Sequence, residues 1–148
     1  MKLNERTLNE FRRRIEAITP DCTPQWGSLK PAQILRHLRA HLDVSLGHEL
    51  VPDESTLMSR TVIKWMIFHV FTRWPKGLPA PAEFFPEPME LFQQERQALL
   101  SRMQEFTQSA AREPGKKVLS RAFGPAPLSY FERMHGLHFQ HHLRQLGV

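Results

Sequence analysis

Apolar side chains recur at three- and four-residue steps along much of this chain, which is the spacing of one helix face. The pattern predicts amphipathic helices over residues 4–18, 28–47, 87–109 and 128–146. The second of these has Ser28 as a candidate N-cap, Pro31 in its first turn and Gly47 where a helix would end. These three residue types agree with the limits that the apolar pattern sets.

Residues 55–74 are apolar on nearly every side of a predicted helix. Such a helix is either mostly buried, or uses a second face against a partner subunit or a membrane surface. Five prolines follow, at positions 75, 79, 81, 86 and 88, and predict an ordered or semi-rigid crossover. No strand-like alternation extends over more than a few residues. The sequence therefore predicts an all-α four-helix bundle, with an additional apolar helix and a proline-rich crossover.

Composition supports one folded domain over residues 1–148, because 41% of the residues are hydrophobic and 24% are charged. Cys22 is the only cysteine, which excludes an intramolecular disulfide and a cysteine-rich zinc site. The net charge of +5 invites a nucleic-acid partner, and residues 12–14 are three consecutive arginines. On a helix they point about 100° apart and acidic residues surround them. A nucleic-acid site is therefore not favoured.

The first residues, MKLNERTLNEF, lack the apolar region of a signal peptide. The most apolar stretch, residues 61–71, is short and is interrupted by Lys64 and His69. We therefore expect no transmembrane segment and a cytoplasmic location.

The last predicted helix carries four histidines in the string HGLHFQHHLRQL: His135, His138, His141 and His142. His138 and His142 are four residues apart and project together into the apolar side of the helix, which is how a helix presents two imidazoles to one metal ion. The alternative is that these histidines hydrogen-bond to the backbone or to each other, or lie in water at an open end of the bundle. A ligand from another helix would favour the metal.

The second predicted helix supplies such a ligand, since His37 and His41 are also four residues apart. His41 lies further inside the apolar stripe, whereas His37 is at its edge beside Val44. Periodicity slightly prefers His41 but leaves the choice open.

Two segments, WGSLKPAQILRHL (residues 26–38) and FGPAPLSYFERMHGLHFQHHLRQLG (residues 123–147), resemble the DinB/YfiT-like superfamily, in particular a functionally uncharacterised branch. The resemblance implies an up-down-down-up four-helix bundle that binds a divalent metal through three histidines. One comes from the second helix in a Leu-x-His context and matches His37. Two come from the last helix and match His138 and His142, with Gln145 at the family's glutamine position. The resemblance therefore favours His37 over His41.

Two positions depart from the branch pattern. Residues 120–122, Ser-Arg-Ala, stand where a His-Pro commonly precedes the Phe-Gly corner, and Gln140 replaces an acidic residue between the closing histidines. The second change removes a carboxylate that would support the metal ligands. Glu132 and Asp43 do not replace it, because both are predicted to be surface charges away from the histidine side of their helices.

Three neutral imidazoles leave open coordination positions on zinc, nickel or ferrous iron, where the pKa of a bound water or thiol falls. Since superfamily relatives look like thiol S-transferases or metal-dependent hydrolases, the resemblance implies transfer of a low-molecular-weight thiol to an electrophilic small-molecule substrate, or hydrolysis. His41, His135 and His141 are candidate proton shuttles or partners of the ligands. Gln145 is a candidate to orient His142 or to contact substrate.

A hypothesis of a different class is a non-catalytic helical bundle that binds a protein partner. It rests on the apolar residues 65–71 and on the basic charge. A homodimer would also cover this apolar helix.

Overall fold

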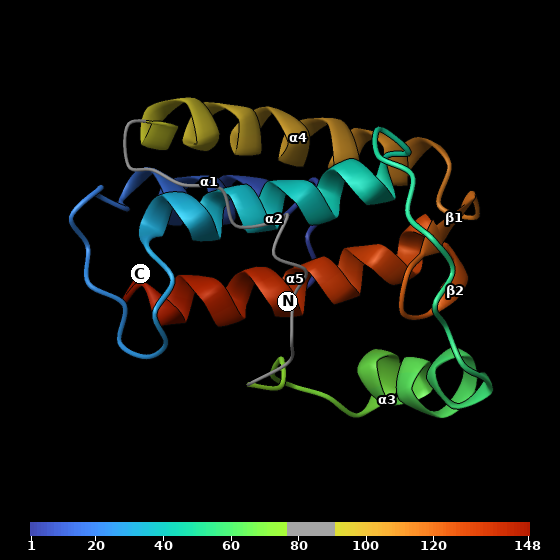
Figure 1. Cartoon of the computed structure of the whole chain (residues 1–148). Coiled ribbons are helices and arrows are strands. Elements are labelled where there is room, and N and C mark those ends of the chain that lie inside the picture. The colour runs from blue at the N-terminus through green and yellow to red at the C-terminus, as the bar shows by residue number, and fades with distance from the viewer. Residues whose placement is uncertain (77–90) are drawn as a thin grey trace.

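The computed structural model describes residues 1–76 and 91–148, and it is mostly helical with one small two-stranded sheet (Figure 1). A π-helical turn over Ser59–Ile63 precedes the third helix. The α-helices are α1 (Leu8–Glu16), α2 (Pro31–Ser45), α3 (Lys64–His69), α4 (Phe92–Arg112) and α5 (Leu128–Gln145). The predicted mainly helical class is thus confirmed. Most of the predicted proline-rich crossover, and the start of the predicted helix at 87–109, lie outside the described residues.

Ion pairs fix the relative direction of α2 and α4. Arg39 of α2 pairs with Glu95 near the start of α4, at 2.9 Å between Nε and Oε2. One turn further along α2, Asp43 pairs with Arg102, which lies further along α4. The two helices therefore run in the same direction, as Figure 1 also shows.

Helix α5 runs back along α2. His37 in the first half of α2 meets His138 in the second half of α5, whereas Ser45 at the end of α2 meets His135, earlier in α5. Helix α1 is likewise antiparallel to α4, since Arg12 contacts Gln104 while Arg96 of α4 reaches the carbonyl oxygen that ends α1. The core lies between these four helices, and its largest fully buried side chains are Phe11, Phe92, Phe106, Phe131 and Phe139.

Helix α2 begins three residues later than the sequence predicted. Its N-cap is Lys30, whose backbone N–H donates to the Gln33 side-chain oxygen at 2.9 Å. Ser28 therefore does not cap the helix, because Pro31 occupies the first helical position and forces the preceding residue into extended backbone. Gly47 follows the helix at φ +77°, as predicted for a residue that ends a helix.

A short antiparallel hairpin, which the sequence analysis missed, leads into α5. Strand β1 (Lys117–Ser120) pairs with β2 (Gly124–Pro127), and Ser120 lies opposite Gly124. Each strand has only four residues, and β2 reads Gly-Pro-Ala-Pro, so neither shows the alternation that identifies a strand. The hairpin ends at Pro127, directly before Leu128, the first residue of α5.

The segment around α3 is largely exposed. For residues 55–74 the sequence offered two alternatives, and the first of them was a mostly buried helix. Ile67 is the only buried residue of α3, whereas Trp65 is 56% exposed. Arg133 of α5 attaches this segment to the rest of the protein, because its guanidinium donates to the carbonyl oxygens of Ile67 and Phe71. The interpretation of a mostly buried helix is wrong. None of the helices in the described part of the chain is both long and apolar enough to cross a membrane.

Candidate metal centre

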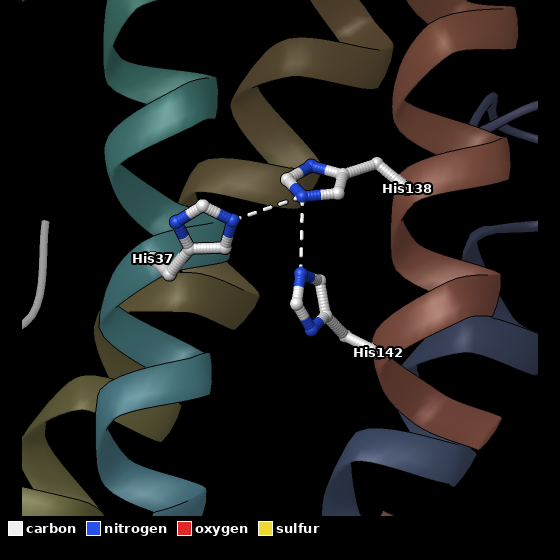
Figure 2. A group of neighbouring side chains, drawn as sticks. All are labelled: His37, His138 and His142. Atoms are coloured by element: carbon white, nitrogen blue, oxygen red, sulfur yellow. Dashed lines mark hydrogen bonds between the residues drawn. The ribbon is translucent and has the colours of Figure 1, made fainter. Parts of the chain in front are cut away.

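Three of the predicted histidines lie together between α2 and α5 (Figure 2). His37 Nε2 is 2.9 Å from His138 Nε2, which is in turn 3.1 Å from His142 Nε2. Their possible ligand atoms all lie within 4.8 Å of one another. The side chains are only 4%, 2% and 7% exposed, respectively. The histidine cluster, as we call these three residues, could hold a metal ion.

Local helix geometry explains why these side chains meet. His138 and His142 are one turn apart on α5, so both project from the same side of the helix. Helix α2 lies antiparallel beside α5 and presents His37 to the gap between them. Leu38 and Phe139, which adjoin His37 and His138 in the sequence, are fully buried in the core.

Hydrogen bonding alone does not satisfy the cluster. Both short contacts converge on a single atom, His138 Nε2. A neutral imidazole nitrogen has either one hydrogen to donate or one lone pair to accept with, so it satisfies one of these contacts well, not both. Three nitrogens around a tetrahedral zinc, each about 2.0–2.1 Å from the ion, would be separated by about 3.3 Å. The two separations that involve His138 Nε2, 2.9 and 3.1 Å, are close to this value, and all three ligand atoms lie within 4.8 Å of one another, so the donor set fits a divalent ion.

Gln145 fixes which nitrogen of His142 carries the proton. The Gln145 amide group donates to the carbonyl oxygen of Trp26 at 2.8 Å, which turns its own oxygen towards His142 Nδ1, also at 2.8 Å. His142 Nδ1 therefore donates to this oxygen, and Nε2 faces the cluster with a free lone pair. This is the orientation that a metal ligand needs.

The cluster histidines are neutral at ordinary pH. Burial, with a smaller contribution from neighbouring imidazoles, lowers the pKa of His37 to about 2 and places the pKa of His138 well below its usual value. Burial also lowers the pKa of His142 to about 4, although its hydrogen bond with Gln145 acts in the opposite direction. Neutral imidazoles keep the lone pairs that bind metal ions.

His41 lies beside the cluster, and its ring nitrogens are not among the three converging ligand atoms. Its ring centre is 4.7 Å from that of His37 and 4.7 Å from that of His138, both in edge-to-face contact. Burial lowers the pKa of His41 to about 4. The apolar pattern slightly favoured His41 as the third ligand. In the structure, however, the ring nitrogen that converges with those of His138 and His142 belongs to His37.

His135 is buried in a separate environment. Its Nε2 lies 2.7 Å from the Ser45 hydroxyl, which in turn donates to the backbone carbonyl of His41 at 3.1 Å. Phe106 and Phe131 contact its ring. These contacts are those of a histidine that links α5 to the end of α2.

His141 lies on the other side of His142 and is partly buried. Its ring is 4.9 Å from the ring of His142 and 5.7 Å from that of Trp26. It lines a cavity of about 390 Å³ together with Trp74, whose ring lies 4.9 Å from that of His138. Sequence reasoning missed Trp74, because no helical or motif spacing connects it to the histidines.

The acidic side chains near these helices are engaged elsewhere. Asp43 is 3% exposed and pairs with Arg39 and Arg102, so the prediction of a surface charge is wrong for this residue. The polar side of α2 is covered by α4, and the two arginines compensate the buried carboxylate. Glu132 is partly buried and pairs with Lys2. In the described ranges, no carboxylate hydrogen-bonds to the histidine cluster.

Comparison with known proteins identifies a family. The model of the family described as "Protein of unknown function (DUF1569)" matches residues 1–147. No curated protein and no solved structure matches the chain. The family description assigns no activity, so any functional conclusion depends on the geometry of the histidine cluster and its surroundings.

Proposed function

The chain belongs to the DUF1569 family, and from its buried histidine cluster we propose that it is a metal-dependent enzyme. His37, His138 and His142 would hold one divalent ion, zinc, nickel or ferrous iron, through Nε2. The single observation that carries this proposal is the convergence of three buried imidazole nitrogens on one point. Gln145 would maintain His142 in the tautomer that binds metal.

The helix arrangement supports a relationship to the DinB/YfiT-like superfamily. Helix α1 is antiparallel to α4, α2 is parallel to α4, and α5 is antiparallel to α2. These directions fit an up-down-down-up four-helix bundle formed by α1, α2, α4 and α5. The resemblance of the two sequence segments and this order of directions point to the same family fold.

We favour transfer of a low-molecular-weight thiol to an electrophilic small-molecule substrate. A divalent ion held by three neutral ligands supplies Lewis acidity, which lowers the pKa of a thiol or a water in an open position. The preference for a thiol over water follows the superfamily resemblance, because a bound thiol and a bound water would each release one proton in the same way. Metal-dependent hydrolysis is the alternative.

Metal content tests the proposal directly. Elemental analysis of untagged protein, purified without chelator, should find about one divalent ion per chain. The His138→Ala, His142→Ala double variant and the His37→Ala variant should lose this ion while remaining folded. His41→Ala is the matched control, since His41 is on the same helix and contacts the same rings without joining the three converging nitrogens.

Two outcomes would overturn these assignments. A folded wild-type protein that contains no ion and takes up none on titration would refute the metal site. Loss of the ion in His41→Ala, with retention in His37→Ala, would make His41 the third ligand.

The thiol hypothesis requires a separate measurement of turnover. The metal-loaded protein should consume small thiols with an alkyl halide or an epoxide, and the metal-free double variant should not.

A second function, binding of a protein partner or a second copy, is favoured by the apolar side chains around α3. Leu57 and Met58 are 81% and 64% exposed, and Trp65 lies near them in the chain. Apolar surface of this kind marks interaction sites when it is contiguous. Light scattering should report a homodimer that Trp65→Glu converts to a monomer. A monomeric wild-type protein would refute the dimer.

A further inference from the structure

A cavity of about 390 Å³ lies next to the histidine cluster, at the end of α5. Residues from three parts of the chain line it: the loop before α2, the segment after α3 and the end of α5. We call it the basic pocket. The lining residues that define its chemistry are Trp26, Arg73, Trp74, Lys76, His141 and Arg144.

The described lining of the basic pocket is positively charged. Arg73, Lys76 and Arg144 line it, and none of its described lining residues is an aspartate or a glutamate. None of the three forms an ion pair with another described residue, whereas Arg39 in the interior pairs with Glu95. Cations that gather around a concave surface without carboxylates raise the local potential and attract anions. Guanidinium groups in particular recognise carboxylates through paired hydrogen bonds.

Two indole rings make the pocket suitable for an organic anion. Trp26 and Trp74 both line it, and the Lys76 ammonium lies 4.2 Å from the centre of the Trp26 ring. Indole faces provide flat apolar surface on which a hydrocarbon or aromatic body can pack. An inorganic anion would use the charges and leave this apolar surface in contact with water. A ligand with one anionic end and an apolar body would use both.

The basic pocket shares a wall with the histidine cluster. The ring of Trp74 is 4.9 Å from that of His138, and the ring of His141 is 4.9 Å from that of His142. Each cluster residue of α5 is therefore in direct contact with a residue that lines the pocket. A molecule bound there would be separated from the cluster by a single layer of side chains.

We propose that the basic pocket binds a small organic carboxylate with an apolar body. Arg73 and Arg144 would hold the carboxylate, while the indoles of Trp26 and Trp74 would pack against the body. Binding of the carboxylate follows from the pocket alone. Its further role, as the substrate or thiol on which the histidine cluster acts, rests on the proposed metal-dependent function.

Isothermal titration of the metal-free chain of residues 1–148 with 2-naphthoate tests the binding. The matched neutral probe is 2-naphthamide, which has the same flat body without the charge. We expect saturable binding of naphthoate that is at least tenfold tighter than that of naphthamide. The Arg73→Gln, Arg144→Gln double variant should lose this preference. The control variant Arg112→Gln, Lys117→Gln removes two exposed charges at the other end of the molecule and should keep it.

Three results would overturn the proposal. The first is equal affinity for the two probes, and the second is an unchanged preference for naphthoate in the pocket variant. The third is that inorganic phosphate competes for the pocket as strongly as naphthoate itself does. Thermal unfolding verifies that the variants fold. Elemental analysis separates this proposal from the metal site. If naphthoate binds charge-selectively but the purified protein contains and takes up no metal, the pocket proposal holds and the metal-dependent function is refuted. If the protein contains one ion per chain but shows no charge-selective binding, the metal site holds and the pocket proposal is refuted.

Discussion

The side-chain oxygen of Gln145 lies 2.8 Å from His142 Nδ1, on the far side of the imidazole ring from the histidine cluster. The amide nitrogen of Gln145 is committed to the backbone carbonyl of Trp26, so the oxygen cannot exchange places with it without losing that bond. The loop before α2 thereby determines the tautomer of a histidine near the end of the chain. Control of this kind is common around metal ligands.

Replacement of Gln145 should therefore weaken metal binding without removing a ligand. Gln145→Leu keeps the size of the side chain but deletes the acceptor for His142 Nδ1. We expect metal affinity to fall about 10–100-fold, the usual effect of losing a partner of this kind. Competition with a chelator of known affinity measures the change. Gln140→Leu, on the same helix and without a hydrogen bond to the cluster, is the control. Equal affinities in both variants would contradict the role of Gln145.

Gly27 gives a second test of the same connection. Gly27 and Gly47 have nearly the same left-handed backbone, at φ +76° and +77°, so alanine at either position should cost about 1–2 kcal/mol of stability. A Cβ at Gly27 would also lie 2.8 Å from the Gln145 amide nitrogen, whereas a Cβ at Gly47 would meet nothing within 4 Å. We expect both variants to unfold more easily, but only Gly27→Ala to bind metal more weakly. Chemical unfolding and chelator competition separate the two effects.

The apolar pattern was enough to locate the helices that carry the histidine cluster. The four-residue spacing of His138 and His142 and the apolar neighbours of α5 are local properties, and helix geometry converts them directly into a shared face. The third histidine was not accessible in this way. Its choice depends on how α2 rotates against α5, which is a property of packing, so the pattern left His37 and His41 open and only the resemblance favoured His37.

Features that depend on contacts between distant segments were missed or misread. Asp43 looked like a surface charge because its helix has a polar side, but α4 covers that side and brings Arg102 to it. The pairing of β1 with β2 is not visible in the pattern of eight residues. Trp74 and Arg73 belong to the segment after α3, yet they line a pocket together with residues at the end of α5. Periodicity describes one element at a time and carries no information about such approaches.

The buried carboxylate of Asp43 should be important for stability. It accepts hydrogen bonds from Arg39 and from Arg102, and it is almost completely shielded from water. Asp43→Asn would leave each guanidinium group with one charged partner fewer, since Arg39 keeps Glu95 and Arg102 keeps Glu105. Loss of a buried hydrogen bond between charged groups costs about 1.5–3 kcal/mol. Asp53→Asn removes a more exposed pair with Arg60 and should cost less. Urea unfolding at neutral pH measures both. Equal losses of unfolding free energy in the two variants would contradict the prediction that the buried carboxylate contributes more to stability.

Acid should destabilise the metal-free protein. Burial lowers the pKa of His41 to about 4, whereas in the unfolded chain an imidazole titrates near 6.5. Below pH 6.5 the unfolded state therefore binds a proton that the folded state does not, and the free energy of unfolding falls as the pH falls towards 4. Between pH 7.5 and 5.0 this one histidine accounts for about 2 kcal/mol of the loss. His41→Gln should accordingly lose about 2 kcal/mol less than the wild type over this interval, as measured by urea unfolding in the presence of chelator. Identical losses in the two proteins would show that His41 does not resist protonation in the folded state.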